Sequence, residues 1–560
     1  MTTAPSPHPT LPAALFACTA LFACGDTATT DTPDPADDAV AAMSLEAYSA
    51  AIQTLSSDEF EGRAPSTPGE ELTVDYLVEQ FQAVGLEPGN GDSFFQNVPL
   101  VALTEQGEPR LTVRAAEGQL SYNWPDEFVA WTRRVVEHES IDDSEMVFVG
   151  YGIVAPEYGW NDYEGVDAAG KTVVMLVNDP GFATQDEAVF RGNAMTYYGR
   201  WTYKFEEAAR QGAAGAIVVH EEAAAGYPWA VVSGGWTGPQ FDQAGEDGNM
   251  DRVQVEGWIQ TEVAREIFAA SGFDYDALAQ AATSPGFQAV ALGAAASVAV
   301  SFDIQRSESR NVLALLPGSE RPDELIIYTA HWDHFGVGDE TMEDPIFNGA
   351  FDNATGTAGL IELARAFAAL PERPARSVLF LAVTAEEQGL LGSAYYAANP
   401  VYPTANTVAT INIDGVNVDG PMNDITVVGM GASELDEYLE AAAGRVGRTL
   451  RPDPEPEKGF YYRSDHFSFA RVGVPSLYTD SGIDHVEHGE EWTLARRADY
   501  TSNRYHKVTD EFDPSWDLTG ALDDLELVFR VGYRIATSGD WPNWREGNEF
   551  RGIRDADRGR

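Results

Sequence analysis

The length, composition and charge of this 560-residue chain limit the classes of fold and of binding partner that it can have. A chain this long exceeds one ordinary core, so two or more domains are expected, and 44% apolar with 11% aromatic residues are typical of a folded protein. With 89 acidic and 35 basic residues the formal net charge is −54, and such a surface repels phosphate, which argues against nucleic acid as a partner. Two interpretations of the acidity stay open: a solvated surface suited to saline or extracellular conditions, and an acidic funnel for cationic amines.

The apolar run LPAALFACTALFAC, which ends at Cys24, is too short to span a bilayer and is typical of a signal sequence. It holds both cysteines, Cys18 and Cys24, so a metal site in the mature body must use histidine and carboxylates. The segment LFACG resembles a bacterial lipoprotein cleavage box with Cys24 as the lipidated residue; simple secretion and an unprocessed tail are the alternatives. We expect a signal peptide and lipobox over 1–24, a flexible tether over 25–43, and an exported protein, either a periplasmic or cell-surface lipoprotein or a secreted one.

Between residues 44 and 300, the pattern of apolar residues changes at about residue 141. In the first segment, 44–140, a helix is predicted because Leu72, Tyr76, Leu77 and Phe81 recur at helical spacing before Gly85, a good C-cap residue. In 141–300, the runs VFVGYG, TVVMLV and GAIVV predict short buried strands, and YKFEEAARQG predicts a helix. The single histidine of this block, His220, is more typical of a surface residue than of a metal ligand.

From Asn311 onward, strands alternate regularly with helices. Strands are predicted at 325–330, 378–384, 408–413, 425–428 and 474–478, and helices at 354–370, 390–398 and 434–443. Strands separated by helices of this length build a mostly parallel central sheet with helices on both faces, an α/β fold. In such sheets, functional sites form beyond the carboxyl ends of the strands.

Histidine and acidic residues lie at or just beyond these strand ends and in the loop before one helix: His331, Asp333, Asp352, Glu386, Glu387 and Asp414. Zinc accepts imidazole nitrogen and carboxylate oxygen, and a hydrolytic site keeps one position open for water. Two zinc ions need a bridging carboxylate, for which Asp352 is the candidate, and two terminal ligands each, which requires one more distant histidine. Asp333 is placed to accept the second ring N–H of His331. In the Glu386-Glu387 pair, one carboxylate can bind metal while its neighbour acts as a general base.

These segments resemble the dizinc exopeptidases of the bacterial leucyl aminopeptidase and glutamate carboxypeptidase type, peptidase M28-like. The matching segments are EGRAPSTPGE, HWDHFG, GAFDNATG, TAEEQGLLGS, INIDG, YRSDHFSFARVGVPSLY and RYHKVTDEFD. The resemblance implies His331, Asp352 as the bridge, Glu387, Asp414 and His506 as zinc ligands, Glu386 as general base, and Tyr505 as an oxyanion stabiliser. It also implies that 141–300 is an inserted, β-rich α/β protease-associated (PA) domain between two peptidase segments, 44–140 and 301–545.

The last ligand has competitors, because His466, His485, His488 and His506 all lie in the C-terminal third. RYHKVTDEFD fits the family position best, which favours His506; His466 precedes apolar residues and suits a structural role, and His485 and His488 lie in an acidic loop.

The function implied by the resemblance is a zinc-dependent aminopeptidase. It would hydrolyse N-terminal residues from peptides through a bridging water activated by two zinc ions and Glu386. The alternatives are a carboxypeptidase of the same fold, a glutaminyl-cyclase-like transferase with one zinc, and an inactive receptor-like binding protein. Side-chain preference and oligomeric state are left open.

Overall fold

A computed structural model describes residues 34–339 and 341–559, and from Pro35 on the chain forms one compact unit. The expected signal peptide and lipobox lie outside the described residues, as does most of the expected tether. The end of that tether is instead a short helix, α1 (Pro35–Val40). Its Ala36 and Ala39 are buried, and Asp37 pairs with Arg530 at 2.7 Å. The packed body therefore starts before residue 44.

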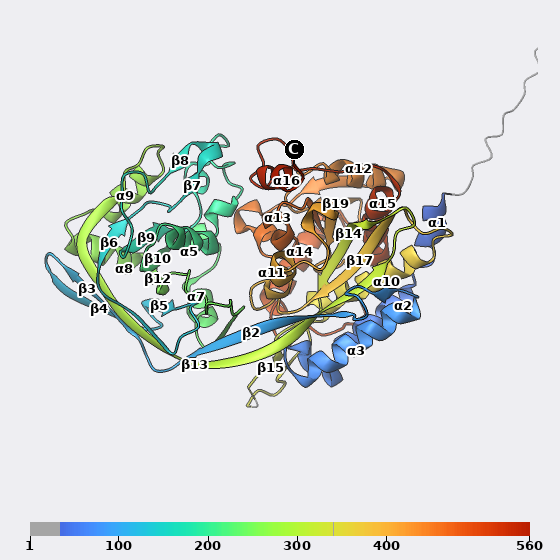
Figure 1. The fold of residues 1–560 in the computed structure, drawn as a ribbon, viewed down its shortest axis with the longest axis horizontal. Helices are drawn as coiled ribbons and strands as arrows, with labels where there is room; N and C mark the ends of the chain where they lie inside the picture. Colours follow the sequence, from blue (N-terminus) through green and yellow to red (C-terminus); the bar gives the residue numbers. More distant parts are fainter. Residues whose placement is uncertain (1–33, 340, 560) are drawn as a thin grey trace, which may run out of the picture. The chain divides into compact units, whose positions relative to one another are not determined.

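The main sheet has four parallel strands at its centre (Figure 1). In spatial order they are β17 (Arg376–Val383), β14 (Arg321–His331), β18 (Thr407–Asn412) and β21 (Ser476–Asp480). Antiparallel neighbours flank them: the end of β13 (Val290–Leu316) pairs with β17, and β19 (Asp424–Val427) pairs with β21. Beyond these lie β1 (Glu87–Pro88) beside β13 and β20 (Thr449–Pro452) beside β19.

Helices cover both faces of this sheet because successive residues of its strands point to opposite sides. In β14, Ile326 and Tyr328 join a core with α2 (Leu45–Leu55), α3 (Pro68–Ala83), α10 (Gly356–Ala368), α12 (Leu435–Arg445) and α15 (Thr519–Thr537). Leu325 and Ile327 join the opposite core, with α11 (Leu391–Ala398) and α13 (His466–Arg471). The strands carry apolar residues on both faces, as buried parallel strands do. The predicted α/β fold class, with helices on both faces of a mostly parallel sheet, is confirmed.

A second sheet, here called the insert, is built by residues between β2 (Phe95–Glu105) and the middle of β13. Four of its strands run parallel: β6 (His138–Phe148), β9 (Thr172–Leu176), β10 (Gly215–His220) and β12 (Val255–Gln260). Its antiparallel members are β3 (Arg110–Ala115), β4 (Gly118–Asn123), β5 (Phe128–Trp131) and the first half of β13. The helices α5 (Trp201–Arg210), α8 (Thr261–Ala270) and α9 (Tyr275–Ala282) pack on it.

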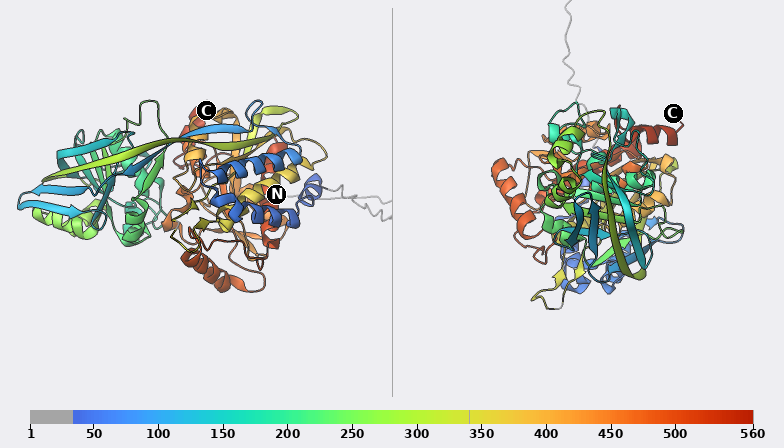
Figure 2. Two further views of the ribbon diagram at one scale, coloured as in Figure 1. Left: turned by 90° about the horizontal axis from the view of Figure 1, so that it is seen from below. Right: turned by 90° about the vertical axis from the view of Figure 1, so that its left-hand side faces the viewer.

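The insert also contains β3, β4 and β5, which lie before the domain boundary predicted at residue 141. Strand patterns show which face is buried but not which sheet a strand joins, so the sequence placed these strands in the first peptidase segment. The two sheets are joined by β2 and β13, which pair from Phe302 to Val312 and run from one sheet to the other (Figures 1 and 2). In the described part of the chain, no helix combines the length and the apolarity that a membrane crossing needs.

Several helices were not predicted, and one of them precedes the loop of His506. The segment after β21, expected as a long loop, contains α14 (Gly489–Asn503), a helix of 15 residues in which Thr493 alone is buried. A helix without an apolar stripe gives no periodic signal, which is why the sequence pattern did not predict it.

Candidate metal centre

The residues predicted to bind metal come together at the carboxyl edge of the main sheet. His331 is the last residue of β14, and Asp414 follows β18 by two positions. Glu386 and Glu387 follow β17, and Asp352 lies in the turn that leads into α10. His506 enters from the loop after α14. In the described residues, three groups of histidine and carboxylate atoms lie close enough to hold a metal ion, and all three are here.

One half of the centre is formed around His331. Its Nε2 atom lies 3.3 Å from Asp352 Oδ1 and 3.3 Å from Asp414 Oδ1. The imidazole is buried, whereas Asp414 keeps 19% of its side chain exposed. The other oxygen of Asp414 accepts a hydrogen bond from the Ser464 hydroxyl at 2.5 Å, which fixes the carboxylate plane.

The other half is formed around His506. Its Nε2 atom lies 3.4 Å from Asp352 Oδ2 and 3.3 Å from Glu387 Oε2. Asp352 therefore presents one oxygen to His331 and the other to His506, which is the arrangement that a bridging carboxylate requires. The His506 side chain is 35% exposed, so this half opens toward solvent.

The electrostatics of the centre fit a bound divalent cation. Burial raises the pKa of Glu386 and of Glu387 well above the usual range, and neighbouring carboxylates raise both further. Several buried carboxylates at one place are costly without a positive charge, and a cation offsets that cost. Imidazole nitrogens and carboxylate oxygens are donors that zinc accepts, so the residues present fit zinc.

Asp333 supports this centre by contacts that differ in part from the predicted ones. His331 Nδ1 lies 3.2 Å from the main-chain carbonyl of Asp333 and 4.0 Å from its carboxylate, so the carbonyl is the nearer acceptor. The Asp333 carboxylate instead accepts the backbone N–H of Glu386 at 3.1 Å and of Glu387 at 3.4 Å. Asp333 thus orients the loop that carries both glutamates.

His334 is a member of the centre that sequence reasoning missed. It is fully buried, and its Nδ1 lies 2.5 Å from Glu387 Oε1. Burial lowers its pKa well below the usual range, so the imidazole is neutral. The motif HWDHFG contains it, and a second histidine three residues after His331 was the available signal.

Two further residues that were not singled out tie the ligand loops together. Arg63, in the motif EGRAPSTPGE, is buried and donates to the carbonyls of Trp332, Leu55, Asn348 and Gly349 at 2.6–2.8 Å. Asp510, in RYHKVTDEFD, accepts the backbone N–H of Asp352 at 3.0 Å and that of Phe351 at 3.2 Å. Arg63 joins the loops of His331 and Asp352, and Asp510 joins those of Asp352 and His506.

Tyr505 and the three histidines that competed with His506 for the last ligand position have the following surroundings. Tyr505 stacks on the His506 ring with centroids 3.7 Å apart, and burial raises its phenol pKa. His466 is buried between Tyr461 and Tyr478, with no hydrogen-bond partner for either ring nitrogen in the described residues. His485 bonds the Asp419 carbonyl and stacks on His488 at 4.6 Å. Within the described residues, His466, His485 and His488 make no ion pair with the carboxylates of the metal centre.

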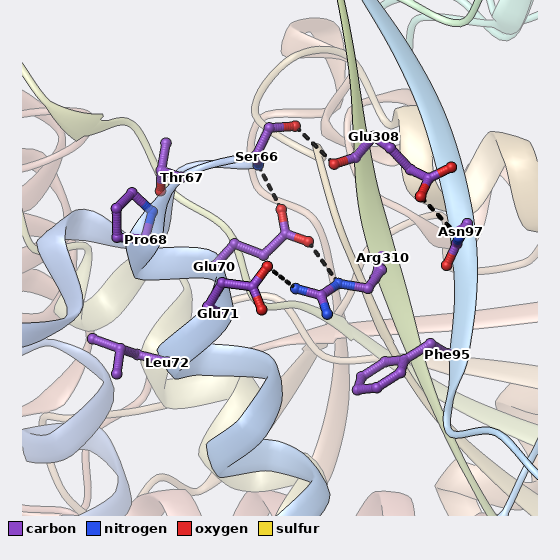
Figure 3. A pocket seen from close by; sticks show the side chains of 10 residues that line it. All are labelled: Ser66, Thr67, Pro68, Glu70, Glu71, Leu72, Phe95, Asn97, Glu308 and Arg310. Atoms are coloured by element: carbon purple, nitrogen blue, oxygen red, sulfur yellow. Dashed lines mark hydrogen bonds and ion pairs between the residues drawn. The ribbon is translucent and has the colours of Figure 1, made fainter.

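A surface hollow lies away from the metal centre, beside α3 (Figure 3). Its Arg310 pairs with Glu70 at 3.1 Å and with Glu71 at 2.6 Å, and Glu70 also accepts the Ser309 hydroxyl. These charges are matched within the protein, so Glu70 and Arg310 fasten α3 to β13 rather than offering a reactive group.

Comparison with known proteins agrees with this geometry. The model of peptidase family M28 matches residues 311–529. A probable zinc metalloprotease from Leptosphaeria maculans is 39% identical over 209 residues, covering 36% of this chain and 47% of that protein. A probable glutamate carboxypeptidase from Arthroderma benhamiae is 27% identical over 240 residues, covering 40% of this chain and 30% of that protein. The chain thus spans less than half the length of these relatives.

Among solved structures, an aminopeptidase from Aneurinibacillus sp. strain AM-1 has a similar fold. It aligns with a TM-score of 0.50 and 20% sequence identity, covering 90% of this chain and 97% of that one. At this identity the likeness concerns the fold.

Proposed function

We propose that this chain is a zinc-dependent aminopeptidase of the M28 type that removes N-terminal residues from peptides, a proposal that the match of the peptidase family M28 model to residues 311–529 supports. One observation carries the proposal: the two oxygens of Asp352 face different histidines, His331 at 3.3 Å and His506 at 3.4 Å. A carboxylate so shared suits two ions rather than one. The names of the metalloprotease relative and of the aminopeptidase with a similar fold support the same activity.

The residues that would hold the two zinc ions divide into two sets. His331 and Asp414 would hold one ion, Glu387 and His506 would hold the other, and Asp352 would bridge them. When bound, zinc polarises the peptide carbonyl and makes a coordinated water more acidic. His334 and Asp333 would orient Glu387 through the contacts described above.

Glu386 is the proposed general base, because it lies beside the ligands but makes no ion pair with either ligand histidine in the described residues. Its carboxylate takes a proton from the attacking water and delivers it to the leaving amine. Burial raises the pKa of Glu386, which makes its carboxylate a stronger proton acceptor than an exposed glutamate. The Tyr505 phenol, kept protonated by its raised pKa, can donate a hydrogen bond to the carbonyl oxygen as charge develops on it.

The test is a substrate panel run on the full-length protein. Aminoacyl anilides and free-N-terminal peptides should be cleaved, N-acetylated peptides should not, and a chelator should abolish cleavage until zinc is added back. Cleavage of N-blocked peptides from the C-terminus would instead identify a carboxypeptidase. Cyclisation of N-terminal glutamine with one zinc per chain would identify a transferase, and binding of peptides without zinc-dependent hydrolysis would identify a receptor-like protein.

Two parts of the sequence prediction remain proposals. We propose that the insert is a protease-associated domain that shapes access to the metal centre, and that the chain is exported and anchored through a lipid on Cys24. Labelled palmitate should be incorporated into the wild type and lost in Cys24→Ser. Incorporation that persists in this variant would contradict the anchor.

A further inference from the structure

A layer of buried polar side chains lies beneath two of the proposed metal ligands. On β14, Thr329 precedes His331 by two positions, and on β18, Asn412 precedes Asp414 by two positions. Thr329 and Asn412 are register partners in the parallel pairing of β14 with β18. Because side chains alternate along a strand, both point to the face on which Ile327 packs against α11 and α13. The two side chains therefore lie next to each other, one step below the ligands.

The carboxyl of Asp465 adjoins this layer from the start of α13. The residue before it, Ser464, accepts a hydrogen bond from Asn412 Nδ2 at 2.7 Å. Asp465 has helical backbone angles, and its carbonyl accepts the backbone N–H of Ser468 at 3.1 Å, so both side chains lie on one helix face. The Ser468 hydroxyl bonds the Ser393 hydroxyl of α11 at 2.9 Å. This face of α13 is therefore turned toward α11 and the strands beneath.

Several oxygen atoms of this layer have no hydrogen-bond partner. Asp465 is 1% exposed, and neither of its carboxylate oxygens has a partner among the described residues. In the same part of the chain, Thr329 Oγ1, Asn412 Oδ1 and Thr410 Oγ1, which lies two positions before Asn412, are also buried and unpaired. An unpaired buried oxygen costs stability, and an unpaired buried carboxylate costs much more. The layer therefore needs an occupant that donates hydrogen bonds or carries positive charge.

The charge of the surroundings favours a cation over water. Seven carboxylates lie at the metal centre or beside it: Asp333, Asp352, Glu386, Glu387, Asp414, Asp465 and Asp510. Two zinc ions and the buried Arg63 would together carry five positive charges, so two negative charges remain. The excess is larger if fewer zinc ions bind. Water satisfies hydrogen bonds but leaves this excess unchanged, whereas a cation offsets it.

The donor set fits a monovalent ion. Asp465 supplies the only charge among the unpaired oxygens described above, and the other donors are neutral hydroxyl and amide oxygens. Protein sites for Ca²⁺ have six to eight oxygen ligands, and zinc is commonly bound by imidazole or thiolate. Neutral oxygens can replace the hydration shell of an alkali ion. We propose that a sodium or potassium ion binds beneath the metal centre, held by the Asp465 carboxylate and the oxygens of Thr329 and Asn412. The inference goes beyond the proposed function, because it does not depend on which bond the protein cleaves.

The first test measures the melting temperature of the full-length protein loaded with zinc, so that the metal centre itself is occupied. Sodium chloride and potassium chloride are each titrated against choline chloride at constant ionic strength. The pH is 8, because burial raises the pKa of Asp465 to about 7 and the carboxylate must be charged. One of the two salts should raise the melting temperature in a saturable way, by about 2 to 3 °C when the ion is at about 100 times its Kd.

Two variants and a matched control assign the effect to this layer. Asp465→Asn should abolish the rise, and Thr329→Val should increase the half-saturating ion concentration by about tenfold. If Asp465→Asn does not fold, Thr329→Val decides the test. The control is Glu105→Gln: Glu105 Oε1 is also buried without a hydrogen-bond partner in the described chain, but it lies on β2, outside this layer. Its loss should leave the salt dependence as in the wild type.

The second test compares crystals equilibrated in the stabilising salt with crystals equilibrated in choline chloride. Difference density should appear beside the Asp465 carboxylate in the wild type and be absent in Asp465→Asn. Equal melting temperatures in all three salts, or an ordered water at Asp465 in both crystals, would overturn the cation site. A salt-dependent rise that persists in Asp465→Asn would place the ion elsewhere and overturn it too. Neither test uses peptide cleavage, so a failure of the aminopeptidase assignment is distinguishable from a failure of this site.

Discussion

The Nε atom of Arg63 donates a hydrogen bond to the main-chain carbonyl of Trp332 over 2.8 Å, one residue beyond His331. The same guanidinium bonds Gly349 at 2.8 Å, three residues before Asp352. One buried side chain therefore sets the spacing between two loops that carry proposed zinc ligands. Because its acceptors are backbone carbonyls, the contact depends on the guanidinium fork and not on neighbouring side chains.

Arg63→Lys should lower the free energy of unfolding by about 3 kcal/mol, because an ammonium cannot reach four carbonyls and leaves buried acceptors unpaired. Zinc affinity should also weaken by about tenfold, as expected when a support of the ligands is lost. Urea unfolding and zinc titration measure the two effects. The control is Arg114→Lys, whose pair with Asp143 is exposed and should contribute below about 1 kcal/mol. Equal effects of the two substitutions would contradict the structural role of Arg63.

Substitutions of the two adjacent glutamates should separate zinc binding from catalysis. Glu386→Gln should keep two zinc ions and lower kcat by about 10³-fold, because the amide cannot accept the proton. Glu387→Gln should lose zinc, because its oxygen faces His506 at 3.3 Å. Metal analysis and kcat on an aminoacyl anilide distinguish the two variants. Near wild-type turnover of Glu386→Gln would show that another group is the base.

Much of the main sheet could be predicted because its strands are short, apolar on both faces and separated by regular helices. The prediction of residues 325–330 corresponds to β14, and the switch-point rule then placed His331, Asp414 and Glu387 at one edge. Strand pairing over long sequence distances could not be predicted. Strand β13 pairs with strands of both sheets, and nothing in its sequence marks where it leaves one sheet for the other.

The residues that hold the ligand loops in place could not be predicted for the same reason. Arg63 and Asp510 act on backbone groups of loops far away in the sequence, and such contacts leave no local pattern. His334 was visible as a second histidine in HWDHFG, but its partner Glu387 lies 53 residues away and is brought near by the parallel pairing of β14 with β17.

The identity of the second terminal ligand can be decided by comparing two histidines. His506→Ala should reduce the zinc content from two ions to one, because its Nε2 faces both Asp352 and Glu387. His334→Ala should keep two ions with affinity weakened about 10- to 100-fold, because it orients Glu387. His488→Ala, remote from the carboxylates, is the control and should bind as the wild type. Loss of one ion in His334→Ala but not in His506→Ala would exchange their roles.

A partly buried carboxyl outside the metal centre should make stability depend on pH. Burial raises the pKa of Glu105, near the end of β2, to about 8, and its Oε1 has no hydrogen-bond partner. Its pKa in the unfolded chain is about 4.3, so between these values the folded state binds more protons and stability falls as pH rises. Glu105→Gln removes this titration. The variant should match the wild type near pH 4.5 and be more stable than it at pH 9, as measured by urea unfolding at each pH. The two pKa values set an upper limit of about 5 kcal/mol on this difference, and the partial exposure of the carboxyl reduces it. Glu108→Gln, on the exposed turn that follows, is the control, and a pH-independent difference between Glu105→Gln and the wild type would show that the Glu105 carboxyl is not the titrating group.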